Sequence, residues 1–83
     1  MNNIQNIPDY SALIPYKIMD IVKLVMENKN TEFSDAISYL YQTQLYEFLS
    51  NEQTKLWHLS THKLFELLED EKQTNQFQFP DFV

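Results

Sequence analysis

The sequence of 83 residues contains no cysteine and no glycine, and all six of its basic residues are lysine. Without cysteine the chain has no disulfide, no thiolate nucleophile and no cysteine-ligated zinc or iron–sulfur site. Without glycine it lacks the phosphate-binding loop, the dinucleotide fingerprint and the nucleophile elbow. We therefore predict a protein that is not an enzyme and that uses no cofactor and no metal.

The absence of glycine also bears on the fold. Tight β-hairpin turns favour glycine, and the apolar residues recur at intervals of three and four rather than alternating. The sequence therefore predicts an all-α fold, a small bundle of three to four helices. We expect a flexible N-terminal arm over residues 1–12, a single helical domain over 13–72 and an aromatic C-terminal tail over 73–83.

The first helix is expected to begin between Ala12 and Pro15, with Ser11 as its cap, and to end near Asn28 or Asn30. Its apolar residues cover an arc of roughly 220°, wider than one buried stripe. The excess indicates either a central position in the fold or a second contact, in a dimer or with a partner. The arc comprises Ile14, Ile18, Met19, Ile21, Val22, Leu24, Val25 and Met26.

The later helices have candidate caps at Ser34, Thr43 and Ser60, with Phe33 as a hydrophobic staple before the first of them. Residues 69–71 are all acidic and stand near the end of the last helix. Acids are unfavourable at that negative end of a helix dipole, so we expect this end to fray or to meet a basic group. The inner face of the second helix is predicted to comprise Ala36, Ile37, Leu40 and Tyr41.

Charge narrows the choice of partner. Twelve acidic residues against six lysines give a formal net charge of −6, and binding to a phosphate backbone depends on basic side chains. We expect no direct contact with nucleic acid. No apolar run approaches the roughly 18 residues that span a bilayer, and the first residues do not resemble a signal peptide. We therefore expect a cytoplasmic protein without a membrane segment.

Two histidines, His58 and His62, have the i, i+4 spacing with which a helix can present two imidazoles to one metal. The residues between them lack the glutamate of a zinc protease, and Ser60 is expected to begin a helix there. We interpret both histidines as structural or exposed. Neighbouring carboxylates such as Glu66 and Asp70 are interpreted as a solvated helix face.

The aromatic residues offer the best candidates for a binding surface. Tyrosine and tryptophan dominate protein interfaces when a core does not bury them. The core is the competing interpretation in the helical part, and disorder or packing onto the chain's own domain is the competing interpretation in the tail. The candidate partner-binding residues are Tyr41, Tyr46, Trp57 and His58 in the helical part, and Phe77, Phe79 and Phe82 in the tail.

Three segments of the sequence together resemble those of a known protein family. Residues 38–49 contain a short Leu-Tyr-x-x-Leu helix pattern, residues 54–60 read Thr-Lys-Leu-Trp-His-Leu-Ser, and residues 64–69 form an acidic, Leu/Phe-rich segment. This arrangement resembles a family of small bacterial helical proteins over about residues 16–72. Members of that family are often encoded beside a toxin-like protein with an ADP-ribosyltransferase fold. The resemblance implies an antitoxin or accessory partner rather than an enzyme.

Two functions follow as hypotheses. The first is an antitoxin-like neutraliser that covers a basic or apolar site on a toxin, with a homodimer as a further use of the wide apolar arc. The second is an acidic mimic of nucleic acid, a phage-type inhibitor of a nucleic-acid-binding protein. The acids that would form the mimic's surface are Glu32, Glu66, Glu69 and Asp70.

Overall fold

The computed structural model describes residues 10–80. This part of the chain contains four α-helices, three short 3₁₀ segments and no strand, which confirms the all-α prediction. Most of the expected N-terminal arm, and Phe82 of the tail, lie outside the described residues. The α-helices are α1 (Ile14–Lys29), α2 (Phe33–Tyr41), α3 (Gln44–Leu49) and α4 (Thr61–Thr74), and the 3₁₀ segments are Tyr10–Leu13, Glu52–Thr54 and Leu56–His58.

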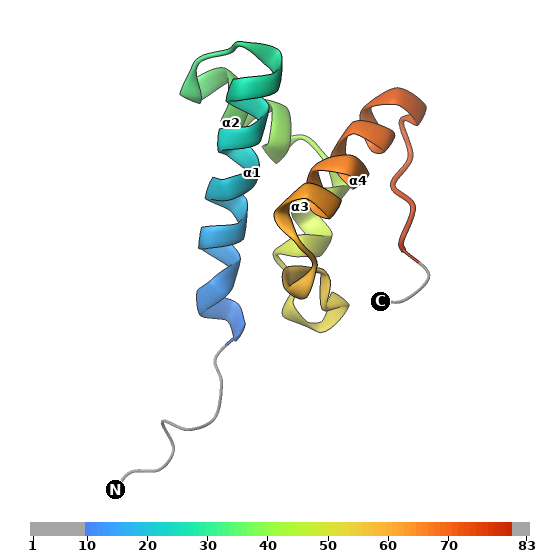
Figure 1. Ribbon diagram of the computed structural model, residues 1–83. Helices are drawn as coiled ribbons and strands as arrows, with labels where there is room; N and C mark the ends of the chain where they lie inside the picture. Colours follow the sequence, from blue (N-terminus) through green and yellow to red (C-terminus); the bar gives the residue numbers. More distant parts are fainter. Residues whose placement is uncertain (1–9, 81–83) are drawn as a thin grey trace, which may run out of the picture.

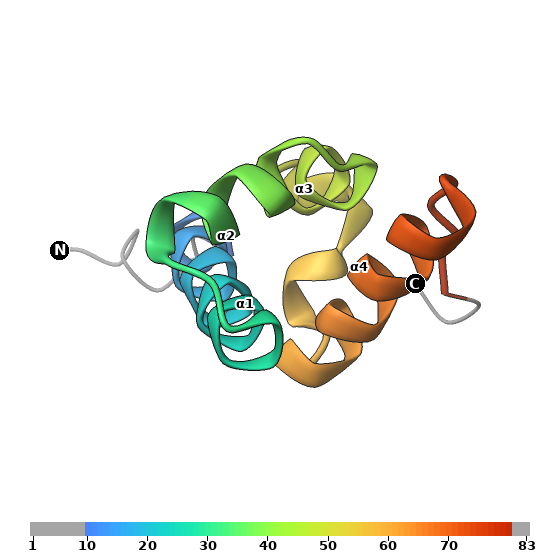
Figure 2. The same ribbon diagram turned by 90° about the horizontal axis from the view of Figure 1, so that it is seen from above.

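The helices form a closed set of neighbours around one core. α1 packs against α2 and α4, and α3 packs against the same two helices from the opposite side. Figure 2 shows this arrangement from above, with the helices following one another around a ring in the order α1, α2, α3 and α4. In Figure 1, α1 and α4 stand beside one another. No helix in the described range is long and apolar enough to cross a membrane.

The core consists of aliphatic side chains from every helix. Ile21, Val22 and Val25 of α1 have no exposed surface, whereas Met19, at the edge of the predicted arc, is 39% exposed. α1 contacts both α2 and α4, which accounts for the breadth of its apolar arc. The centre of the arc is buried, and its edges are partly exposed. The fully buried residues from the remaining elements are Ala36, Leu40, Leu45, Leu49, Leu56, Leu64 and Leu68.

The predicted caps have mixed outcomes. Thr43 and Ser60 begin α3 and α4, and each side-chain oxygen accepts a backbone N–H from three residues ahead. The prediction of Ser11 and Ser34 is wrong: the capping positions of α1 and α2 are Leu13 and Glu32, and neither side chain forms a cap hydrogen bond. Ser11 lies within the 3₁₀ segment Tyr10–Leu13, which leads directly into α1 without a break.

The predicted environments of two aromatic residues are also wrong. Phe33 is the first residue of α2 rather than a staple before it, and its side chain is 47% exposed. Tyr41, expected on the inner face, is 52% exposed. The reason is helical geometry: each residue rotates about 100° from the last, so burial of Leu40 turns the next side chain toward the surface.

The acidic end of α4 does not fray, contrary to the first of the two outcomes expected. The helix continues through residues 69–71 to Thr74 because two of these acids have partners elsewhere in the fold. Lys29 Nζ lies 2.6 Å from Glu69 Oε1. The carboxylate of Glu71, which is buried, accepts hydrogen bonds from the backbone N–H groups of Gln44 and Leu45 at 2.7 and 2.9 Å. Glu71 therefore meets the positive N-terminus of α3.

Candidate functional site

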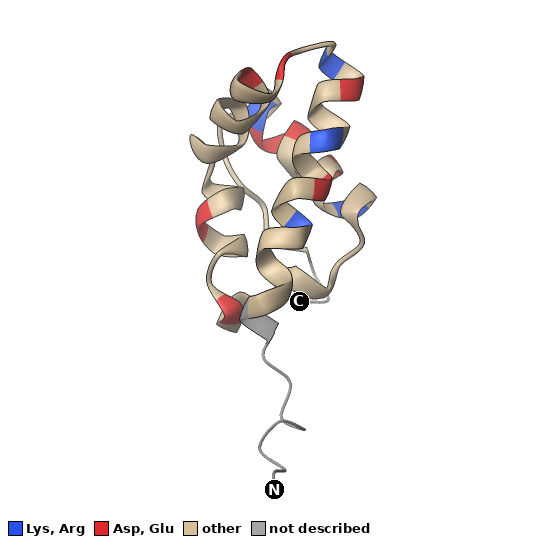
Figure 3. Ribbon diagram, turned by 90° about the vertical axis from the view of Figure 1, so that its left-hand side faces the viewer, with Lys and Arg blue, Asp and Glu red and all other residues tan. Residues whose placement is uncertain are grey.

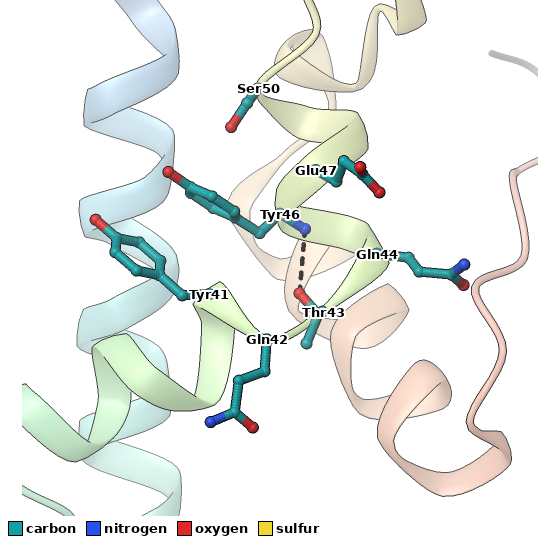
Figure 4. Close-up of a pocket in the computed structure, with 7 residues that line it drawn as sticks. All are labelled: Tyr41, Gln42, Thr43, Gln44, Tyr46, Glu47 and Ser50. Carbon is teal, nitrogen blue, oxygen red and sulfur yellow. Dashed lines mark hydrogen bonds between the residues drawn. The ribbon is translucent and has the colours of Figure 1, made fainter.

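An open concavity lies at the junction of α2 and α3. It has a volume of about 540 Å³ and is wide at its mouth, so it is shaped to receive a group from another surface rather than to enclose a small molecule. We call its lining the α2–α3 face. Figure 4 shows the lining residues, which are Tyr41, Gln42, Thr43, Gln44, Tyr46, Glu47 and Ser50.

Two candidate residues from the sequence, Tyr41 and Tyr46, meet on this face. Their ring centroids are 4.5 Å apart and the ring planes are inclined by 36°. Figure 4 shows the two side chains extending in the same direction, with the hydroxyl groups at their outer ends. Tyr46 also packs against the core, whereas Tyr41 is half exposed. The pair therefore combines an anchored ring with an accessible one.

The backbone that carries the pair is fixed by hydrogen bonds. Thr43 Oγ1 donates to the Leu40 carbonyl at 2.6 Å and accepts the N–H of Tyr46 at 3.1 Å. The carboxylate of Glu71 accepts the two preceding N–H groups of α3, those of Gln44 and Leu45. The first turn of α3 thus has its free donors satisfied, and the position of Tyr46 relative to Tyr41 is set by this short connection.

Gln44 connects the face to the tail. Its side-chain Oε1 accepts the backbone N–H of Phe77 at 3.1 Å, and Figure 4 shows this side chain pointing away from the tyrosines, toward the tail. The rings of Phe77 and Phe79 lie 5.4 and 4.8 Å from that of Phe48 on α3. Two of the three candidate tail residues therefore pack on the chain's own domain, although Phe79 remains 47% exposed.

Trp57 and His58 do not line the α2–α3 face. Trp57 is half buried against the core, and its indole N–H donates to the Glu52 carbonyl at 2.8 Å. The centroid of its ring lies 5.4 Å from that of His58, and the two ring planes are inclined by 78°. A 3₁₀ segment ends at His58 and α4 begins after Ser60, so His58 and His62 do not share one continuous helix, as predicted. Within residues 10–80 no group of three or more potential metal ligands comes together.

A second polar group surrounds Tyr39, two residues before Tyr41. We call Tyr39, Lys29, Glu69 and Lys72 the Tyr39 cluster. The Tyr39 hydroxyl donates to Glu69 Oε2 at 3.1 Å, and Lys29 donates to the other oxygen of that carboxylate. Lys72 Nζ lies 4.0 Å from the centroid of the Tyr39 ring. This cluster joins α1, α2 and α4.

The contacts in the Tyr39 cluster shift the pKa values of Lys29 and Tyr39 upward. The hydrogen bond to Glu69 raises the pKa of the Lys29 ammonium. Burial, followed by the hydrogen bond to Glu69, raises the pKa of the Tyr39 hydroxyl. The Lys29 ammonium and the Tyr39 hydroxyl therefore keep their protons beyond their usual pH range.

Charge is distributed unevenly along the chain. Residues 30–54, which include α2 and α3, contain the four acids Glu32, Asp35, Glu47 and Glu52 and no lysine, and all four acids are exposed. Along α1 the two signs alternate, as Figure 3 shows. The α2–α3 face therefore belongs to the acidic part of the molecule, with Glu47 as the charged residue in its lining.

Comparisons with family models, curated proteins and solved structures found no match. The resemblance carried by residues 54–60 accordingly stays a prediction.

Sequence reasoning found the two tyrosines of the face but not the residues that frame it. The spacing of apolar residues does not indicate that Gln42, Gln44 or Ser50 lies beside the tyrosines, although all of them fall within residues 41–50, next to the predicted cap Thr43. From the sequence, Glu71 is expected to destabilise the end of its own helix. Its stabilising partners on α3 are 26 and 27 residues away in sequence, so the pattern around Glu71 does not indicate them.

Proposed function

We propose that this chain is a protein-binding module without enzymatic activity, and that the α2–α3 face is its contact surface. The observation that carries the proposal is the Tyr41–Tyr46 pair, a half-exposed ring supported by an anchored one at the rim of an open concavity. Aromatic side chains in such positions are the usual energetic anchors of protein interfaces.

The other aromatic candidates support the choice by contrast. Phe77 and Phe79 pack against Phe48 and against each other, although Phe79 still exposes 47% of its surface, and the Trp57 indole N–H has an acceptor within its own loop. These side chains are partly used by the fold. Tyr41 has Tyr46 as its ring partner and still exposes about half of its surface, which leaves it available for a contact.

The specific partner is the less supported part of the proposal. A toxin encoded nearby is the partner that the resemblance implies, and a second copy of the chain is the alternative. The nucleic-acid mimic gains no support, because Glu69, one of the four acids that it requires, is held by Lys29 and Tyr39. Binding of a protein through the tyrosine pair is therefore the function that the geometry favours.

The test compares three forms of the immobilised full chain: wild type, Tyr41→Ser and the matched Tyr16→Ser. Tyr16 is a suitable control because it is 72% exposed on α1, outside the face. Each form is incubated with lysate of the source cells and with the purified product of the neighbouring gene, and retained proteins are quantified by mass spectrometry.

We expect one protein to be retained by wild type and Tyr16→Ser and to be depleted by Tyr41→Ser. The same dependence should recur when that protein is purified and mixed with the three forms. Equal retention by all three forms, or retention of nothing by wild type, would show that the face is not a protein-binding surface.

A further inference from the structure

We infer that the α2–α3 face recognises a cationic side chain, an arginine or lysine displayed by its protein partner, and seats it against the Tyr41–Tyr46 pair. This inference rests on the proposed function and names the chemistry of the partner. It is carried by three features of the described residues: the charge around the face, the rings that line it, and a cation–ring contact elsewhere on α2.

The segment that carries the face, residues 30–54, has charged side chains of one sign. Glu47 lines the concavity, and the nearest lysines in sequence are Lys29 and Lys55, on either side of a segment that holds four exposed acids. Neither ion pair of the described residues involves an acid of this segment. An incoming cation would therefore meet carboxylates that are not engaged in either of these ion pairs, whereas a phosphate or an acidic peptide would be repelled.

The rings supply the second requirement. Aromatic faces attract ammonium and guanidinium groups that approach within about 6 Å of the ring centre. Tyr41 presents such a ring, and Tyr46 beside it widens the aromatic surface. Polar groups of Gln42 and Ser50 line the same concavity. Their oxygen atoms can accept hydrogen bonds from the several N–H donors of a guanidinium group.

The third feature is a precedent within the molecule. On the same helix, Tyr39 already has a lysine ammonium 4.0 Å from its ring centroid, supplied by Lys72. Tyr41 is of the same residue type and lies two positions further on; within residues 10–80, the two lysine ammonium groups placed over an aromatic ring, those of Lys29 and Lys72, both lie over Tyr39. The partner would supply at Tyr41 what α4 supplies at Tyr39.

The probe for the test is a blocked pentapeptide, Gly-Ser-Arg-Ser-Gly, with an acetylated N-terminus and an amidated C-terminus. The matched peptide carries citrulline in place of arginine, which keeps the shape of the side chain and removes its charge. Each peptide is titrated into the full chain, and the ring resonances of Tyr41, Tyr46 and Tyr16 are followed by NMR.

We expect saturable shifts of the Tyr41 and Tyr46 resonances with the arginine peptide. The citrulline peptide should bind at least about fivefold more weakly. Tyr16→Ser should leave the titration unchanged, Tyr41→Ser should abolish it, and Glu47→Gln should weaken it about threefold. Circular dichroism of each variant establishes that it is folded. Equal binding of both peptides, or equal shifts of Tyr16, would overturn the inference.

The two proposals can fail separately. If both peptides bind equally while retention of the protein partner still depends on Tyr41, the cationic side chain is wrong and the protein-binding function stands. If partner retention is indifferent to Tyr41, the proposed function is wrong, and this inference about its partner falls with it.

Discussion

Tyr39 and Tyr41 lie on the same helix, two residues apart, and have opposite environments. Tyr39 is enclosed by a carboxylate and two ammonium groups from α1 and α4, whereas Tyr41 has a second tyrosine and an open concavity. Leu40, between them, is completely buried. Three consecutive residues thus belong to an interhelix network, to the core and to the surface. The same residue type is held by contacts within the fold at Tyr39 and is half exposed at Tyr41.

This comparison separates stability from binding. Changes at the Tyr39 cluster should affect unfolding and leave the α2–α3 face intact, whereas changes at Tyr41 should affect binding and leave stability nearly unchanged. The following predictions are ordered by their expected effect on stability, from the largest to the smallest.

Leu40→Ala should be the most damaging change, because it removes the buried side chain that both tyrosines flank. We expect a loss of about 2–5 kcal/mol in the free energy of unfolding, measured by urea denaturation. A chain of this length has a total stability of only about 4–12 kcal/mol, so some of the protein could unfold outright. Leu40→Met keeps the volume and should cost less than about 1.5 kcal/mol. Equal losses for the two variants would contradict the burial of this side chain.

Glu71→Ala should follow, with a loss of about 2–3 kcal/mol, because the part-buried N–H of Gln44 and the buried N–H of Leu45 lose their charged acceptor. The measurement is the midpoint of urea unfolding. The matched control is Glu66→Ala on the same helix, an exposed acid 3.7 Å from Lys63, which should change stability by less than about 0.5 kcal/mol. Equal effects would mean that α3 does not depend on the carboxylate of α4.

Tyr39→Phe should cost about 1 kcal/mol, the usual contribution of one hydrogen bond. The ring and its contact with Lys72 remain, and only the hydroxyl donor to Glu69 is lost. Thermal unfolding provides the stability, and the arginine-peptide titration should be the same as for wild type. A weaker titration would show that the two tyrosine environments are coupled.

Alkaline pH should destabilise the Tyr39 cluster selectively. The pKa values of Tyr39 and Lys29 are raised in the folded chain, so the folded state binds these protons more tightly than the unfolded state. Their contribution to stability is complete below about pH 10 and is lost as the pH rises through their folded pKa values. We expect the Tm of wild type to fall more steeply than that of Tyr39→Phe as the pH rises above about 10. Parallel curves would contradict this assignment.

Tyr41→Ser should have the smallest effect on stability, about 0.5 kcal/mol, at the low end for an aromatic pair. The same substitution should have the largest effect on partner retention. A loss of stability as large as that of Glu71→Ala would place Tyr41 in the fold rather than on a binding surface.

How much of this arrangement was predictable depends on sequence separation. The caps at Thr43 and Ser60 act on N–H groups three residues ahead and were found from sequence. The α2 cap was missed because Ser34 is a better cap by type than Glu32, yet the chain enters the helix at Phe33. The two tyrosines were predicted as candidates, but their meeting depends on the turn between α2 and α3. The contact of Glu71 with the start of α3 was not predictable from sequence, since it requires the packing of α4 against α3.

The bond from Glu71 to the start of α3 has a consequence for the order of events during synthesis. α3 has six residues, and helices that short do not persist on their own. Its first turn is secured by a carboxylate that leaves the ribosome 26 residues after Leu45. A nascent or prematurely terminated chain that lacks Glu71 would therefore present α2 without a fixed Tyr46. The α2–α3 face therefore takes its final form only after Glu71 has been synthesised and α4 has packed against α3.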